Sequence, residues 1–367
     1  MHIYVNENMY MKNIGFMRSV LWHVFCACTL LVGCFNGNGS SVVFHNLSLD
    51  SLDEMAIDGE KVYCVSLVDD SEHFTRRLET YLNLDEWASR HVIYNIVDVR
   101  QSQNEWWLKW LAPVSLPVTC VFTHDGRLTD LIPGMAKESF LYIRQAAKDE
   151  RSTVFHYPNN FERDKSKLLP WLGCVLECKK HLDEGICLSE GLELVSDSLK
   201  YPYPYYLQIV GALSERDTVV ACKAAQSMLA CEDPYKLNLY KSEYITAKKI
   251  LNPDFDMKDE PSIRVDKDII ELVGCKVDED FPFSIVVFND GNRPLCISKI
   301  FKSCSCLKWP KESEKIIVPS NGSASLDFIF RADSKGEVMR EMYMVSNAIN
   351  NPILYLVIFL TILKIHT

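Results

Sequence analysis

The stretch that decides the fold of the first half of the chain is Ser115–Gly134, with the sequence SLPVTCVFTHDGRLTDLIPG. Two apolar, β-rich runs, Ser115–Phe122 and Leu128–Ile132, lie on either side of Asp125-Gly126. An Asp-Gly pair between such runs is a strong hairpin signal, because glycine adopts the positive φ angle that a tight turn requires. The stretch therefore predicts two antiparallel strands joined by a short turn.

Two further strands and three helices are predicted around this hairpin. Residues 61–68 and 92–99 are β-rich apolar runs that are typical of buried strands. Asp69-Asp70-Ser71 follows the first of them and is a natural helix N-cap, with acidic side chains placed favourably against the helix dipole. The helices are marked by apolar residues at helical spacing: Phe74, Leu78, Tyr81 and Leu82, then Trp106, Trp107, Leu108, Trp110 and Leu111, then Phe140, Ile143 and Ala146.

The order strand, helix, strand, helix, hairpin, helix over residues 55–150 resembles that of the thioredoxin family. Leu116-Pro117-Val118 is similar to the segment that carries the cis-proline of that family, and Pro133-Gly134 closes the hairpin as it does in many members. The resemblance implies an α/β thioredoxin-like domain with a cis peptide bond before Pro117.

The redox pair of that family is missing from this chain. Redox-active members carry Cys-x-x-Cys at the N-terminus of the first helix, where the helix dipole lowers the pKa of the thiol. Here that place holds 69–73 (DDSEH), and carboxylates cannot exchange disulfides. Asp69, Asp70 and His73 are either a remaining ligand-binding edge or a solvated helix cap. Cys120 follows the proline and stays a weak catalytic candidate, with burial as a small apolar residue as its alternative.

Residues 160–255 predict an α-helical domain. Helical periodicity runs through 168–182, 186–199, 206–213, 219–229 and 240–250. The prolines of Tyr201–Tyr206 (YPYPYY) are expected to fix a turn before the third helix. Small residues at the expected helix crossings resemble tetratricopeptide-type repeats, and a plain helical linker domain is the alternative. Cys174, Cys178 and Cys187 lack a second closely spaced pair and so are poor zinc ligands, even with His181 as a fourth.

Residues 268–363 predict an all-β domain. Short β runs separated by turn residues recur at near-regular spacing, which is typical of a β-sandwich. The final apolar run, 353–363, is well short of the ~20 residues that a membrane-spanning helix needs. The predicted strands cover 269–272, 281–288, 295–300, 316–318, 324–330, 338–345 and 353–363.

The motif order F-N-x-G-x-x-P-L, S-C-x-C, P-x-x-G, G and S-N resembles a family of bacterial exported domains without an assigned reaction. Its members are Ig-like sandwiches, frequent on cell-envelope lipoproteins, so the resemblance implies an Ig-like fold. The family commonly has Gly between the cysteines and Thr after the turn Asn, where this chain has Ser305 and Asp290. The matching residues are Phe288, Asn289, Gly291, Pro294, Leu295, Ser303, Cys304, Cys306, Pro319, Gly322, Gly336, Ser346 and Asn347.

Cys304 and Cys306 are the second weak catalytic candidate. Two residues apart on a strand, their side chains would share one face of the sheet. A disulfide between them is possible and would be easily reduced. Metal binding would need further ligands, of which Cys296 is the only one close in sequence. A purely structural sulfur pair is the alternative.

The N-terminus is similar to a bacterial lipoprotein signal. Lys12 and Arg18 form a positive region, and the apolar run 20–33 follows. Leu31-Val32-Gly33-Cys34 resembles the lipobox, which implies cleavage after Gly33 and acylation of Cys34. Residues 1–33 would then be the signal peptide and 34–54 a flexible tether. A plain secretory signal or a buried apolar helix is the alternative.

Composition excludes several classes of protein. The 367 residues are 48% apolar and 24% charged, which excludes long disordered or low-complexity architectures. Lys and Arg number 39 and Asp and Glu 49, and a net charge of −10 argues against nucleic acid as a partner. The 14 cysteines are too few for a fold built on disulfides.

Two classes of function follow from the sequence. The favoured one is a non-catalytic envelope lipoprotein that binds or scaffolds a protein or cell-wall partner, without cofactor or metal. The alternative is a thiol–disulfide oxidoreductase or metal-handling protein that uses Cys304 and Cys306, or Cys120. The first is favoured because neither a paired nucleophile and base nor a complete ligand set occurs. The expected location is the bacterial outer membrane, facing the periplasm, because no acidic cluster follows Cys34 to direct it outward.

Overall fold

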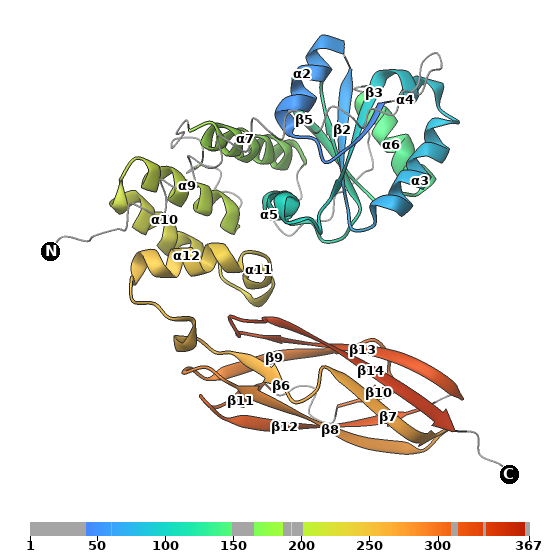
Figure 1. The fold of residues 1–367 in the computed structure, drawn as a ribbon, viewed down its shortest axis with the longest axis vertical. Coiled ribbons are helices and arrows are strands. Elements are labelled where there is room, and N and C mark those ends of the chain that lie inside the picture. Colours follow the sequence, from blue (N-terminus) through green and yellow to red (C-terminus); the bar gives the residue numbers. More distant parts are fainter. Residues whose placement is uncertain are drawn as a thin grey trace, which may run out of the picture.

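The computed structural model describes residues 42–59, 61–148, 165–185, 192, 201–309, 315–332 and 335–363. An N-terminal α/β part, a helical middle part and a C-terminal pair of β-sheets follow one another along the chain (Figure 1). The predicted multidomain order is therefore confirmed in outline. The signal peptide expected over residues 1–33, with Gly33 and Cys34, lies outside the described residues.

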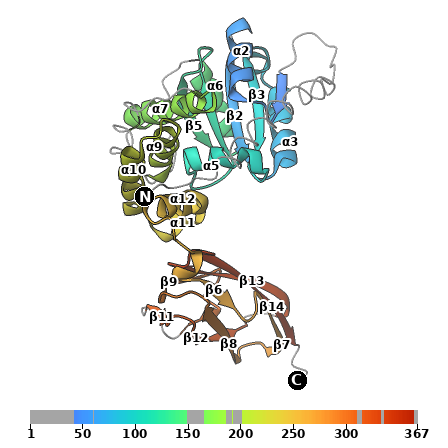
Figure 2. The ribbon, with the colours of Figure 1, turned by 60° about the vertical axis from the view of Figure 1, so that its left-hand side comes forward.

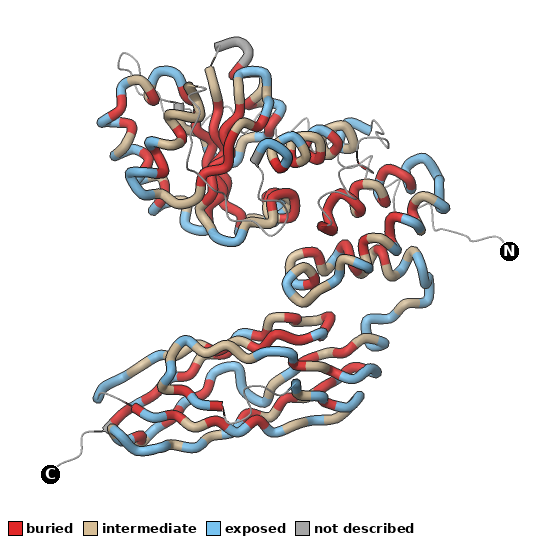
Figure 3. The backbone as a smooth tube through the Cα atoms, turned by 180° about the vertical axis from the view of Figure 1, so that it is seen from behind, coloured by how far each residue is buried: buried red, intermediate tan, exposed pale blue. Residues whose placement is uncertain are grey.

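A central sheet organises the α/β part. Its strand order among the described residues is β1-β3-β2-β4-β5, with β1, β2 and β3 parallel and β4 and β5 antiparallel to their neighbours. The inner strands are buried along their length (Figure 3), as their continuous apolar runs predicted. The strands are β1 (Val42–His45), β2 (Val62–Val68), β3 (Val92–Asp98), β4 (Val118–Phe122) and β5 (Leu128–Pro133).

The α/β part begins earlier than the sequence indicated. Residues 34–54 were expected to be a tether, but β1 pairs with β3 and the helix α2 (Leu49–Gly59) follows it. Leu52 and Ala56 of this helix are completely buried. A strand of four residues is too short to show alternation, so the pattern could not separate it from the preceding Gly- and Ser-rich segment.

Helices cover both faces of the sheet and form two apolar clusters. Phe74, Leu78, Phe140 and Ile143 pack on one face. Helices α2 and α5 cover the other, with Trp110 completely buried. The helical elements are α3 (Ser71–Leu82), α4 (Glu86–His91), the 3-10 helix η2 (Ser102–Asn104), α5 (Glu105–Leu111) and α6 (Lys137–Ala147).

The helical middle part lies between the α/β sheet and the C-terminal sheets (Figures 1 and 2). The turn expected at Tyr201–Tyr206 is wrong, because Pro202 and Pro204 lie in the first turn of α9, where no backbone N–H is needed. The predicted helix 186–199 lies outside the described residues apart from Leu192. The helices are α7 (Lys165–Asp183), α9 (Pro202–Ser214), α10 (Thr218–Ala230), α11 (Pro234–Leu239) and α12 (Lys241–Leu251), followed by the 3-10 helix η3 (Met257–Asp259).

The α/β and helical parts, expected as domains over 55–150 and 160–255, share one hydrophobic core among the described residues. The apolar cluster on one face of the sheet continues without a break into α7, α9, α10 and α12. The indole Nε1 of Trp110 donates to the carbonyl of Leu172 at 2.9 Å, and the Tyr240 hydroxyl donates to the carbonyl of Lys109 at 2.7 Å. Both parts thus bury their apolar surface against each other.

A buried ion pair lies within this shared core. Lys109 Nζ is 2.7 Å from Glu243 Oε1 and 3.1 Å from Glu105 Oε1, and the side chains of Lys109 and Glu243 are 10% and 6% exposed. Burial by itself would lower the pKa of Lys109, but the hydrogen bonds and charges of the two glutamates raise it. The ammonium therefore stays charged inside the interface.

Two sheets form the C-terminal part. The described strands run in the orders β10-β12-β8-β6 and β11-β9-β13-β14-β7, with a core of alternate side chains between them. The predicted sandwich is confirmed in outline, and it starts before residue 268, at β6. The strands are β6 (Ile263–Val265), β7 (Ile269–Lys276), β8 (Asp280–Asn289), β9 (Leu295–Lys302), β10 (Leu307–Lys308), β11 (Ile316–Val318), β12 (Ser323–Arg331), β13 (Gly336–Ser346) and β14 (Ile353–Leu363).

The apolar run 353–363 is strand β14, which pairs with β13 and β7 inside the five-stranded sheet. Within the described part of the chain, no helix is long and apolar enough to span a membrane.

Replacement of Lys109 by Met is expected to destabilise the shared unit by about 3 kcal/mol, because it leaves the Glu243 carboxylate buried without its cation. Glu105→Gln is the matched control and should cost under about 1 kcal/mol, because Glu105 is half-exposed. Urea unfolding followed by tryptophan fluorescence measures both. Because the pKa of Lys109 is raised in the folded state, its contribution is complete at neutral pH and is lost only as the pH rises through that pKa. Equal destabilisation by the two variants would contradict this account.

Candidate functional site

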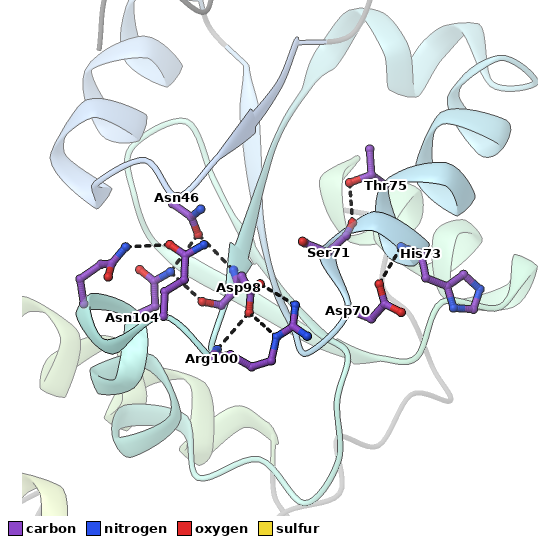
Figure 4. A network of polar contacts seen from close by, with 10 residues as sticks. Asn46, Asp70, Ser71, His73, Thr75, Asp98, Arg100 and Asn104 are labelled. Carbon is purple, nitrogen blue, oxygen red and sulfur yellow. Dashed lines mark hydrogen bonds and ion pairs between the residues drawn. The ribbon is translucent and has the colours of Figure 1, made fainter. Parts of the chain in front are cut away.

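The first candidate site is the edge of the α/β sheet at the carboxyl ends of β2 and β3. Asp69 and Asp70 follow β2 directly, and Asp98 ends β3 (Figure 4). The Leu116–Pro117 peptide bond, which precedes β4, is cis. Side chains at the carboxyl ends of neighbouring parallel strands meet at one edge, which is the usual position of a ligand site in α/β folds.

A carboxylate occupies the N-terminus of α3. Asp70 Oδ1 accepts a hydrogen bond from the backbone N–H of His73 at 2.9 Å, and the Thr75 hydroxyl donates to the carbonyl of Ser71 at 2.6 Å (Figure 4). The predicted N-cap is thereby confirmed. Asp69, Asp70 and His73 are exposed, so this end of the helix presents charged and polar groups to solvent and no thiol.

Arg100 provides positive charge at the same edge. Its backbone N–H, Nε and Nη2 donate to the carboxylate of Asp98 at 3.0, 3.0 and 2.8 Å. These hydrogen bonds lower the pKa of Asp98. The pKa of Arg100 is raised first by Asp98, and the charges of Asp70 and Asp69 add to the effect. The acidic helix cap and the Asp98–Arg100 pair therefore belong to one electrostatic group.

Two asparagines fix the backbone beneath this group. Asn46, at a positive φ of 56°, accepts from the backbone N–H of Asp98 at 3.1 Å and from Asn104 Nδ2 at 2.8 Å. Asn104 Nδ2 also donates to the carbonyl of Asp98 at 2.8 Å. The sequence patterns did not predict Asn46, Asn104 or Arg100. The signal that could have revealed them is the cluster of polar residues directly after each strand.

The edge combines exposed and buried charge. Asp69, Asp70, His73 and Arg100 are exposed, whereas Asp98 is buried and bonded to Arg100. Over the described ranges, no group of three or more His, Cys, Asp or Glu side chains is placed to hold a metal ion.

The two thiols of the sheet lie away from the edge. Cys120 pairs with Val65 and Leu131 in the middle of the sheet and belongs to the apolar cluster shared with the helices, whereas Cys64 faces the opposite cluster. Both are completely buried, and burial raises the pKa of each thiol far above its usual range. Of the two alternatives for Cys120, the structure shows burial as a small apolar residue, because its strand position turns it into the core.

The second candidate site is the disulfide between Cys304 and Cys306, whose Cα atoms are 5.2 Å apart. The pair lies in a turn between β9 and β10, not on a strand as expected. Cys296 is distant from it, since this residue pairs with Ile317 at the beginning of β9. Arg340 of β13 places Nε 3.4 Å from Cys306 Sγ. No spacing rule links residues so far apart in sequence, so Arg340 could not be predicted.

The fold does not depend on this disulfide for the shape of the turn. The backbone N–H of Ser303 donates to the carbonyl of Glu341, and the N–H of Arg331 donates to the carbonyl of Cys306, both at 2.9 Å. The N–H of Glu341 donates to the Ser303 hydroxyl, also at 2.9 Å. A crosslink that closes a loop of three residues stabilises a fold by only about 1.5 kcal/mol.

Two further motif residues of the sandwich, Asn289 and Gly291, have structural roles. Asn289 is buried and its Nδ2 donates to the carbonyls of Arg293, Val318 and Pro319, at 2.8 to 3.2 Å. A Cβ atom on Gly291 would lie 1.9 Å from the carbonyl oxygen of Glu260, so only glycine fits there. These residues fix the loop at this end of the sandwich and point to no ligand.

Comparison with known proteins identifies no relative by sequence. No protein-family model matches the chain. No curated protein matches it either. Among solved structures, the ASH/PapD-like domain 7 of human CEP192 is 8% identical and covers 29% of this chain and 88% of that one, with a TM-score of 0.25.

Two other solved structures that this chain resembles are a protein of unknown function from Porphyromonas gingivalis and the YadV chaperone. The first is 13% identical over 30% of this chain and 50% of that one, with a TM-score of 0.25. The second is 9% identical over 29% and 54%, with a TM-score of 0.23. The chain thus spans about half the length of these two proteins, and similarity at this level assigns no function.

Burial predicts that Cys64 and Cys120 resist alkylation in the native protein. We expect both to react with N-ethylmaleimide at least about 100-fold more slowly than after unfolding in guanidinium chloride, because the thiolate does not form in the core. The half-buried Cys222 and Cys296 serve as internal controls and should react first. Peptide mass spectrometry measures the labelling of each cysteine. Early labelling of Cys120 would instead restore it as a candidate nucleophile.

Proposed function

We propose that this chain is a non-catalytic lipoprotein of the bacterial cell envelope that binds a protein or cell-wall partner. Acylation of Cys34 would attach it to the outer membrane on the periplasmic side. The lipobox-like residues 31–34 and the basic and apolar segments before them support the anchor. Each CH₂ of an acyl chain that enters the bilayer contributes about 0.8 kcal/mol, so more than one chain gives a stable attachment.

We further propose that the α/β part is a thioredoxin-like domain and that the sandwich is the Ig-like domain of the exported family. The sheet order β1-β3-β2-β4-β5 and the cis bond before Pro117 support the first assignment. The two packed sheets and the signature residues Asn289, Gly291 and Asn347 support the second.

The observation that carries the binding role is the polar edge formed by Asp69, Asp70, His73 and Arg100. In redox-active thioredoxins, the corresponding helix N-terminus holds the thiols; here, Asp70 fills it with a hydrogen-bonded carboxylate. Exposed charges on a preformed backbone bind a polar partner at low entropic cost. The edge is therefore the proposed contact surface.

The scaffold also keeps its parts together. Lys241 Nζ donates to the carbonyl of Asn350 at 2.9 Å, and the amide group of Asn350 forms two hydrogen bonds with the backbone of Ile263. The backbone N–H of Ile349 donates to the carbonyl of Pro261 at 2.9 Å. Residues 252–262, here called the linker, connect α12 to the sandwich. Contacts between α12, the linker and the sandwich thus support a protein that presents two units from one anchor.

The lipid anchor is tested by metabolic labelling with radioactive palmitate. The wild-type chain is expected to incorporate label and to fractionate with membranes, whereas Cys34→Ala incorporates none. Cys304→Ala is the matched cysteine control and should retain full labelling. Recovery of the native chain unprocessed in the cytosol would reject the lipoprotein assignment.

The binding edge is tested by photo-crosslinking in cells that produce the protein. A photoreactive amino acid at position 73 is expected to give a discrete crosslinked product, while the same group at the exposed Lys223 of α10 gives none. Combined Asp69→Lys and Asp70→Lys replacement should reduce the product at least about threefold, because it reverses the charge of the edge. Equal products at positions 73 and 223, or none at position 73, would exclude this edge.

A further inference from the structure

We propose that the Cys304–Cys306 disulfide is a thiol–disulfide exchange centre that accepts two electrons from a pair of thiols on a partner protein, with Arg340 stabilising Cys306 as the leaving thiolate. This exchange is stoichiometric and adds to the non-catalytic binding role proposed above. It belongs to the sandwich and is independent of both the lipid anchor and the proposed binding edge.

The pair is accessible to a partner thiol. Cys304 and Cys306 are half-buried, and Ser305 between them is exposed. Strand β9 begins beside Asn347, near the linker to the helices, and ends beside Met342. The turn that follows β9 therefore lies toward the end of the sandwich that points away from the linker.

The turn holds both sulfur atoms together in either oxidation state. Backbone hydrogen bonds to Glu341 and from Arg331 fix residues 303 and 306 independently of the sulfur–sulfur bond. After reduction, the two thiols thus stay close enough to form the disulfide again.

Arg340 supplies positive charge directly at one of the two sulfurs. Its Nε lies 3.4 Å from Cys306 Sγ, and its Nη1 donates to the carbonyl of Met339 at 3.0 Å, which orients the guanidinium. Two charged side chains nearby have other partners: Arg331 lies 3.6 Å from Asp280, and Glu341 bonds to Tyr355. Among the described contacts, the guanidinium of Arg340 lies at Cys306 Sγ, which makes this sulfur the leaving group of the proposed exchange.

The exchange is balanced in two steps. A partner thiolate attacks Cys304 Sγ, the bond to Cys306 breaks, and its electron pair goes to Cys306 Sγ beside Arg340. A second partner thiolate then attacks the partner's sulfur in this mixed disulfide and releases Cys304. The partner loses two electrons and two protons and gains a disulfide, while Cys304 and Cys306 become two thiols.

The test follows the oxidation state of the pair in the full chain, extracted in detergent, with reduced dithiothreitol as the dithiol probe. Trypsin releases both cysteines on one peptide, Ser303–Lys308, whose mass reports the disulfide. Wild type is expected to be reduced readily, and Arg340→Gln about three- to tenfold more slowly, because loss of the cation weakens the leaving group. Arg331→Gln is the matched control, since this arginine is on β12, which pairs with β10 after the turn, and its side chain lies 3.6 Å from Asp280. Its rate should equal that of wild type.

A second measurement identifies the attacked sulfur. Brief exposure to reduced glutathione, followed by acid quenching and tandem mass spectrometry, is expected to place glutathione on Cys304. Glutathione on Cys306, equal rates for Arg340→Gln and Arg331→Gln, or a peptide that stays oxidised in excess dithiothreitol would each overturn the proposal. Far-UV circular dichroism and melting curves that match the wild type establish that the variants are folded.

Discussion

The described residues between 42 and 251 depend on burial of one apolar surface that two segments of the chain share. One face of the α/β sheet carries α5, and helices α7, α9, α10, α11 and α12 pack against the same cluster. Lys109 lies in this interface with Glu243, where a cation without a partner would be costly. The pair therefore restricts how α5 and α12 meet. This constraint fixes α5 relative to α12.

The same burial decides where sulfur chemistry is possible. Strands that are covered on both faces place Cys64 and Cys120 in apolar surroundings, where the charged thiolate is disfavoured. The Cys304–Cys306 pair lies in a turn of the sandwich, beside solvent and a guanidinium. The proposed binding edge and the proposed exchange centre lie in different units and use different side chains, so one chain can carry both.

Much of this architecture could be predicted from local patterns, and the failures have physical causes. The hairpin after Pro117, the cap at Asp70 and the strands of the sandwich depend on residues close in sequence. Strand β1 was missed because it gains its stability only from pairing with β3. The prolines of α9 indicate a turn or a first helical turn equally well. Asn46 and Arg340 act through contacts across 52 and 34 residues, which no periodicity encodes.

Positive potential next to the reacting group distinguishes the two candidate sites. A helix N-terminus carries the equivalent of about half a positive elementary charge, which stabilises a nearby anion. At α3, the Asp70 carboxylate already occupies this position. A thiol placed there would compete with this cap and with the neighbouring Asp69. At the sandwich turn, the guanidinium of Arg340 contacts sulfur directly, and the nearby Glu341 is bonded to Tyr355 instead. Electrostatics therefore disfavours a thiolate at the first site and favours one at the second.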